Sequence, residues 1–205
     1  MDKKILLVGL ASFLLIGAVA VGVFVSGKPA SFIGTAYSQP YTVAPGIELT
    51  RANGTSFRLS EMRGKIVLML FGYTSCPDIC PTTLAGLKQV LDKLGPDADQ
   101  VQVLFVTVDP KRDTAQRMQD YVNHFNSGFV GLSGSEAELA KVWNAYGIFR
   151  EVVPGTSAAG YLVNHTARIT VIDPQGNLRV SFVPNTPVEN IVHDLKLLLR
   201  ETAEN

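Results

Sequence analysis

Residues 66–80 have the sequence IVLMLFGYTSCPDIC, in which a run of apolar residues ends shortly before two cysteines. The apolar run predicts a buried strand, and the spacing of apolar residues in Pro81–Leu94 predicts a helix after it. Cys76 and Cys80 are the only cysteines in the chain. If the helix begins at Pro77 or just before it, both thiols lie on one helix face, with their Cβ atoms about 5–6 Å apart.

Two thiols at this separation suit either a reversible disulfide or the binding of one soft metal ion by two thiolates. A helix N-terminus favours the thiolate over the thiol, and both chemistries need the thiolate. The alternative is a structural disulfide, but a bridge that closes so short a loop stabilises a fold by only about 2 kcal/mol. Zinc is a poorer candidate, because a structural zinc site uses four ligands and the sequence has no second cysteine pair.

The rest of the globular part alternates between predicted strands and helices. Asn53-Gly54 is a hairpin signal, and Asp113 is the expected N-cap of the helix that follows the second buried strand. The predicted strands are Ile47–Thr50, Phe57–Leu59, Ile66–Phe71, Val101–Val108, Ala167–Ile172 and Leu178–Phe182. The predicted helices are Pro81–Leu94, Thr114–Phe125, Ser135–Tyr146 and a last one from Pro187 to about Arg200. This order predicts an α/β sandwich of the thioredoxin-like kind, with Cys76 and Asp109 at the carboxyl edge of its sheet.

The N-terminal segment Ile5–Val25 contains no charged residue. A helix of this length spans about 31 Å, close to the roughly 30 Å hydrocarbon core of a bilayer. Lys3 and Lys4 precede it, which predicts a cytoplasmic N-terminus and a translocated remainder. Signal-peptide cleavage after residues 18–20 is the alternative, but it would cut inside the apolar run. The sequence predicts a single-pass protein of the inner (plasma) membrane with its C-terminal domain on the periplasmic side.

Composition divides the chain into three parts. Residues 1–25 are expected to form a cytoplasmic tip and a transmembrane anchor, residues 26–40 a flexible tether, and residues 41–205 the thioredoxin-like domain. The formal net charge is zero and no Lys/Arg-rich run occurs, so nothing indicates a nucleic-acid partner. A protein with two thiols that is exported to an oxidising compartment must be kept reduced by a partner or be capped by metal.

One of the three histidines lies at a position that predicts a role. His124 and His193 fall in helical patterns and are interpreted as ordinary surface or half-buried residues. His165 lies just before the last hairpin, where a thioredoxin-like fold packs a loop against its thiols and commonly carries a cis-proline that this segment lacks. Two thiolates and one imidazole favour Cu(I), and the imidazole also supports Cu(II). The alternative is a core histidine that is bonded to the backbone.

Three segments resemble the motifs of the Sco/SenC family: GYTSCPDICP at residues 72–81, VDPKRDT at residues 108–114 and YLVNHT at residues 161–166. Together with the apolar N-terminal segment and the order of strands and helices, the resemblance covers essentially the whole chain. Members of this family are membrane-tethered, copper-binding, thioredoxin-like proteins that help to mature the CuA centre of cytochrome c oxidase.

The resemblance also implies which residues act. Cys76, Cys80 and His165 correspond to copper ligands, and Asp109 corresponds to a supporting carboxylate. The family often has an acid immediately before the ligand histidine, whereas this chain has Asn164, which can orient a neighbour by hydrogen bonding but brings no charge.

Two functions of different classes follow from these residues. One is a copper metallochaperone that delivers copper to the copper-binding subunit of the oxidase and receives it from an upstream periplasmic donor. The other is a thiol–disulfide oxidoreductase, supplied by a thiol reductant, that keeps the oxidase's copper-ligand cysteines reduced through a redox-active Cys76–Cys80 pair. His165 favours copper, because dithiol exchange does not require an imidazole. A peroxiredoxin-like peroxidase is disfavoured, because the expected threonine and proline spacings before Cys76 are absent. No residue is assigned a catalytic role.

Overall fold

The computed structural model describes residues 31–154 and 160–203 of the chain. Within these two ranges, no helix has both the length and the apolar character needed to cross a membrane. The predicted anchor Ile5–Val25 lies outside the described residues. The described residues from Phe32 onward belong to one compact unit.

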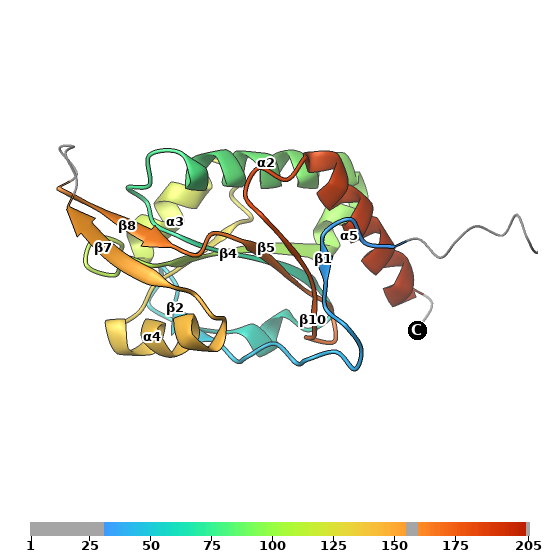
Figure 1. Ribbon diagram of the computed structural model, residues 1–205, viewed down its shortest axis with the longest axis horizontal. Helices are drawn as coiled ribbons and strands as arrows, with labels where there is room; N and C mark the ends of the chain where they lie inside the picture. Colours follow the sequence, from blue (N-terminus) through green and yellow to red (C-terminus); the bar gives the residue numbers. More distant parts are fainter. Residues whose placement is uncertain (1–30, 155–159, 204–205) are drawn as a thin grey trace, which may run out of the picture. The chain divides into compact units, whose positions relative to one another are not determined.

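A six-stranded sheet with the strand order β1-β10-β9-β4-β5-β6 forms the centre of this unit (Figure 1). β4, β5 and β6 run parallel to one another. On the other side of β4 every pair is antiparallel: β9 with β4, β10 with β9, and β1 with β10. The carboxyl ends of β4 and β5 therefore meet at one edge of the sheet. The strands are β1 (Thr35–Ala36), β4 (Ile66–Gly72), β5 (Val101–Thr107), β6 (Val130–Leu132), β9 (Ile169–Ile172) and β10 (Leu178–Phe182).

Both faces of the sheet are covered, and the central strand β4 is buried along its whole length. Successive side chains of a strand point to opposite faces. Accordingly, Ile66, Leu68 and Leu70 belong to one hydrophobic core, and the residues between them belong to the other. The first core contains residues of α2 (Ile79–Leu94), α3 (Ala115–Asn123) and α5 (Val188–Ala203).

The second core contains residues of α4 (Glu136–Ala145), the hairpin β2–β3 (Glu48–Thr50 and Ser56–Arg58) and the 3-10 helix η1 (Leu59–Met62). Figure 1 shows α2 and α5 on one side of the sheet and α4 on the other. A second 3-10 helix, η2 (Gly95–Gln100), connects α2 to β5. The α/β sandwich predicted from the sequence is confirmed.

A second hairpin, β7–β8, is absent from the predicted elements. It consists of β7 (Arg150–Pro154) and β8 (Tyr161–His165), which pair antiparallel with Arg150 opposite His165. The segment that contains His165 is thus a strand and not only a loop before the last hairpin. Most side chains of β7 are exposed, so the sequence carries no burial pattern that would indicate a strand there.

The N-terminal part of the domain begins within the segment predicted as a tether. β1 pairs with β10, placing Thr35 opposite Ser181. Just before β1, the backbone N–H groups of Ile33 and Gly34 donate to the buried carboxylate of Asp194 on α5, at 2.8–3.0 Å. Residues 33–36 are therefore bonded to the domain.

Candidate functional site

Both cysteines lie in or next to the turn that joins β4 to α2. β4 ends at Gly72 and α2 begins at Ile79, which is two residues before the predicted start at Pro81 but after Pro77, the start that would place both cysteines within the helix. Cys80 lies in the first helical turn and is buried, whereas Cys76 lies in the preceding turn and is half-buried. The backbone N–H of Cys80 donates to the Cys76 sulfur at 3.4 Å. The N-cap residue of α2 is Asp78, and the Cys76 sulfur satisfies one of the first N–H groups of the helix, which have no partner within it.

The two thiols differ in acidity. The Cys80 side chain forms a hydrogen bond with the Cys76 sulfur, and this bond lowers the pKa of Cys76 to about 6, although burial of Cys76 acts to raise it. Backbone amides at the start of α2 and the imidazole of His165 contribute in the same direction. The contact with Cys76, together with burial, raises the pKa of Cys80. The shift in the pKa of Cys76 favours the thiolate of the more accessible sulfur, and the thiolate is the form that attacks disulfides and binds metals.

His165 lies at the end of β8, and both of its ring nitrogens face backbone oxygens. Nδ1 is 3.1 Å from the Val163 carbonyl oxygen, and Nε2 is 3.2 Å from the Phe71 carbonyl oxygen. A neutral imidazole carries one N–H, so only one of these contacts is then a hydrogen bond. The ring packs edge-on against Tyr73, with 5.9 Å between ring centroids. These are the contacts expected of a backbone-bonded histidine.

The structure brings two of the three predicted ligands together. Across the part of the chain that the structure describes, no three His, Cys, Asp or Glu side chains form a group that could hold a metal ion. Cys76 and Cys80 are adjacent, and soft sulfur donors fit Cu(I). His165 is near enough to influence Cys76, but both of its ring nitrogens lie against backbone carbonyl oxygens and not against the sulfurs. His124 and His193 are exposed, as interpreted from the sequence.

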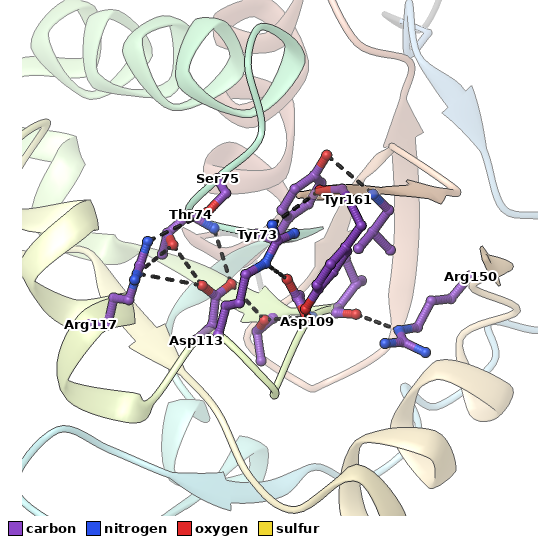
Figure 2. A network of polar contacts seen from close by, with 12 residues as sticks. Tyr73, Thr74, Ser75, Asp109, Asp113, Arg117, Arg150 and Tyr161 are labelled. Carbon is purple, nitrogen blue, oxygen red and sulfur yellow. Dashed lines mark hydrogen bonds and ion pairs between the residues drawn. The ribbon is translucent and has the colours of Figure 1, made fainter. Parts of the chain in front are cut away.

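Asp109 lies at the predicted carboxyl edge, but its carboxylate is directed at the β7–β8 hairpin. The side chain is fully buried and accepts hydrogen bonds from the Tyr161 hydroxyl, at 2.8 Å, and from the Arg112 guanidinium. Arg112 also donates to the Tyr161 carbonyl oxygen at 3.0 Å and stacks 3.6 Å from the centre of the Tyr161 ring. Figure 2 shows Asp109 beside Tyr161 within this network. These contacts make Asp109 a support of the hairpin that carries His165.

Asp113 has a role that the sequence reasoning missed. Thr114, and not Asp113, is the N-cap of α3, and its hydroxyl accepts from the Arg117 N–H. The buried Asp113 carboxylate instead accepts from the Thr74 N–H at 3.0 Å and from the Thr74 hydroxyl at 2.6 Å. The Thr107 hydroxyl donates a third bond at 2.9 Å. Burial raises the pKa of Asp113. An aspartate before a helix predicts a cap, and nothing in the sequence showed that this one turns toward the cysteine turn.

Comparison with known proteins gives consistent matches over the domain. The SCO1/SenC family model matches residues 35–200. The chain is similar to a SCO2-like protein of Rickettsia felis, with 30% identity over 201 residues that make up 96% of this chain and 98% of that protein. Apo Sco1 of Thermus thermophilus is 36% identical, with a TM-score of 0.74 over 84% of this chain and 99% of that one. Bradyrhizobium japonicum ScoI with copper bound is 38% identical, with a TM-score of 0.69 over 77% of this chain and 99% of that one.

Proposed function

Because the chain belongs to the SCO1/SenC family, we propose that it is a copper metallochaperone for the CuA centre of cytochrome c oxidase. The observation that carries the proposal is the pair of adjacent free thiols, one half-buried and acidic and the other buried, at the sheet edge. Copper is the cargo, received from an upstream periplasmic donor and passed to the copper-binding subunit of the oxidase. A relative that is 38% identical has been solved with copper bound, which supports this assignment.

In this proposal Cys76, Cys80 and His165 hold the copper ion. The two sulfurs supply soft ligands, and because the pKa of Cys76 is low and that of Cys80 is raised, the proton that metal capture displaces comes mainly from Cys80. The imidazole of His165 contributes a third ligand after it leaves one backbone carbonyl. Asp109 stays outside the ligand set, because its carboxylate is occupied by Arg112 and Tyr161.

The thiol asymmetry also favours a second candidate function, that of a thiol–disulfide oxidoreductase for the oxidase's copper-ligand cysteines. An acidic, accessible Cys76 suits the attacking thiol, and a buried Cys80 beside it suits the thiol that resolves the mixed disulfide. Both functions require reduced thiols, so they are compatible in one protein.

Copper binding by the full chain, purified reduced and supplied with copper, tests the proposed function. We expect one copper per chain, lost in Cys76→Ser and in Cys80→Ser. His165→Ala should leave both thiols titratable but weaken copper binding or shift the Cu(II) absorption spectrum. His124→Ala is the matched control, because His124 is exposed and lies outside the site. An unchanged affinity and spectrum in His165→Ala, together with a lower melting temperature, would show that His165 is a structural histidine.

We also propose that Ile5–Val25 anchors the chain in the inner membrane with the domain on the periplasmic side. The uncharged run with lysines on its short N-terminal flank supports this topology. Fusions at the C-terminus should give active alkaline phosphatase, which folds only in the periplasm, and inactive cytoplasmic reporters. The opposite pattern of reporter activity would overturn the topology.

A further inference from the structure

The candidate site has two halves, the turn that carries Cys76 and the hairpin that carries His165. Each half contacts a different side chain of one turn, residues 109–113. We infer that Thr74 and Tyr161 are positioning residues. Thr74, through Asp113, fixes the turn that carries Cys76, and Tyr161, through Asp109, fixes the hairpin that carries His165. That these residues position copper ligands rests on the proposed copper function, whereas the contacts themselves are present in the metal-free chain.

On the thiol side, Thr74 is bonded to Asp113 through both its backbone and its side chain. The two contacts, at 3.0 and 2.6 Å, end on different oxygens of the carboxylate. The Thr74 hydroxyl also accepts a hydrogen bond from Arg117 at 2.9 Å, so its one donor and one of its two acceptor sites are paired with charged side chains. Two residues later, the Cys76 N–H donates to the Tyr73 carbonyl oxygen at 3.2 Å and closes the turn. Thr74 thus connects the cysteine turn to the turn after β5 through its two hydrogen bonds with Asp113.

On the imidazole side, Tyr161 and His165 point to the same face of β8, because they are four residues apart on one strand. The Tyr161 hydroxyl donates to Asp109 at 2.8 Å, and the Arg112 guanidinium lies flat over the Tyr161 ring. Between them along β8, the backbone N–H of Val163 donates to the Tyr73 hydroxyl at 3.3 Å. The position of His165 is therefore set by a strand that side chains outside the hairpin hold in place.

The two carboxylates belong to one rigid turn. The Asp113 N–H donates to the Asp109 carbonyl oxygen at 2.9 Å, and both side chains are fully buried. Figure 2 shows Asp113 directed at Thr74 and Asp109 directed at Tyr161 from neighbouring positions. Residues 109–113 thus link the cysteine turn to β8, alongside the direct contacts of β8 with Phe71 and Tyr73. Thr74 and Tyr161 each supply a hydroxyl contact to this segment that can be removed separately.

Two conservative substitutions test the two ends separately. Thr74→Val removes the hydroxyl at nearly constant volume, and Tyr161→Phe removes only the phenol oxygen. Thr202→Val and Tyr41→Phe are the matched controls, since they delete one and two hydroxyl hydrogen bonds, respectively, away from residues 109–113. Thr74→Ser, which keeps the hydroxyl, should behave as the parent chain.

In the metal-free full chain, Thr74→Val deletes the hydroxyl's bonds with Asp113 and Arg117. It should shift the dithiol–disulfide equilibrium constant against glutathione by at least about tenfold, the effect of one hydrogen bond to a charged group. Its β7–β8 amides should exchange with solvent as in the parent chain. Tyr161→Phe should show the reverse, with amide exchange in β8 faster by about tenfold and an unchanged equilibrium constant. With copper bound, Tyr161→Phe should also move the Cu(II) spectrum in the direction of His165→Ala.

The inference is overturned if both variants only lower the melting temperature, or if each changes both readouts equally. It is also overturned if the control variants produce the same shifts. If the parent chain binds no copper, the proposed function fails, while the equilibrium constant and the amide exchange still decide the positioning roles.

Discussion

In cells that lack this protein, chains with Cys76→Ser, Cys80→Ser or His165→Ala should each fail to support oxidase assembly at limiting copper. Loss of either thiol removes a soft ligand, because oxygen is a poor match to Cu(I). Loss of the imidazole removes the third proposed ligand while leaving the dithiol intact. Added copper should partly restore assembly in each case, because mass action compensates for weaker capture. The measurement is cytochrome c oxidase activity in membranes, normalised to the amount of each variant.

His165→Ala is the variant that separates the two candidate functions. Dithiol exchange proceeds through a mixed disulfide between sulfurs, so a reductase tolerates the loss of His165. A copper donor does not. Full oxidase activity from His165→Ala at limiting copper would remove the chaperone proposal and leave the reductase. His193→Ala serves as the control for the loss of an imidazole, because His193 is exposed on α5.

The parts of the fold that the sequence predicted are those with a strong local pattern. β4 and β5 are continuous apolar runs, and α2 has a regular apolar face, so periodicity was sufficient to place them. The hairpin β9–β10 could be predicted equally well, from the turn residues between its strands. The hairpin β7–β8 was missed, because contacts from far along the chain stabilise it. Examples are Tyr161 with Asp109, and the Arg150 guanidinium with the Val108 carbonyl oxygen.

In the candidate site, too, the features set by local sequence were predicted and those set by long-range contacts were not. The cysteine pair was predicted from local spacing, since a short distance in sequence ensures a short distance in space. The roles of Asp113 and Thr74 were not predicted, because they lie 39 residues apart and meet only when β4 and β5 pair in parallel. The place of His165 came from its position before the last predicted hairpin and from the resemblance of its motif, whereas its contacts with two backbone carbonyls were visible only in the fold.

Gly72→Ala should both destabilise the domain and disturb the cysteine pair. A Cβ atom at Gly72 would lie 2.7 Å from the Cys80 sulfur and 2.6 Å from the Phe105 ring, closer than real Cβ contacts. Phe105 is buried and packed on its other sides, so it yields little. Overpacking of this kind typically costs about 1–3 kcal/mol of unfolding free energy. Urea unfolding of the reduced full chain measures this loss.

The displaced sulfur gives Gly72→Ala a second, chemical signature. If Cys80 moves away from Cys76, the contact that does most to lower the pKa of Cys76 is lost, and this pKa rises from about 6 toward its usual range. The thiolate fraction at pH 7 then falls, so alkylation of Cys76 by iodoacetamide at that pH should slow by about tenfold. Gly86→Ala is the matched control, because Gly86 lies on α2 and an added Cβ there meets no atom within 4 Å. A lower stability and a slower alkylation in Gly72→Ala than in Gly86→Ala would show that Gly72 is needed for the Cys80 sulfur to lie close to β4. Equal stability and equal alkylation rates would show that the strand end accommodates a methyl group without moving Cys80.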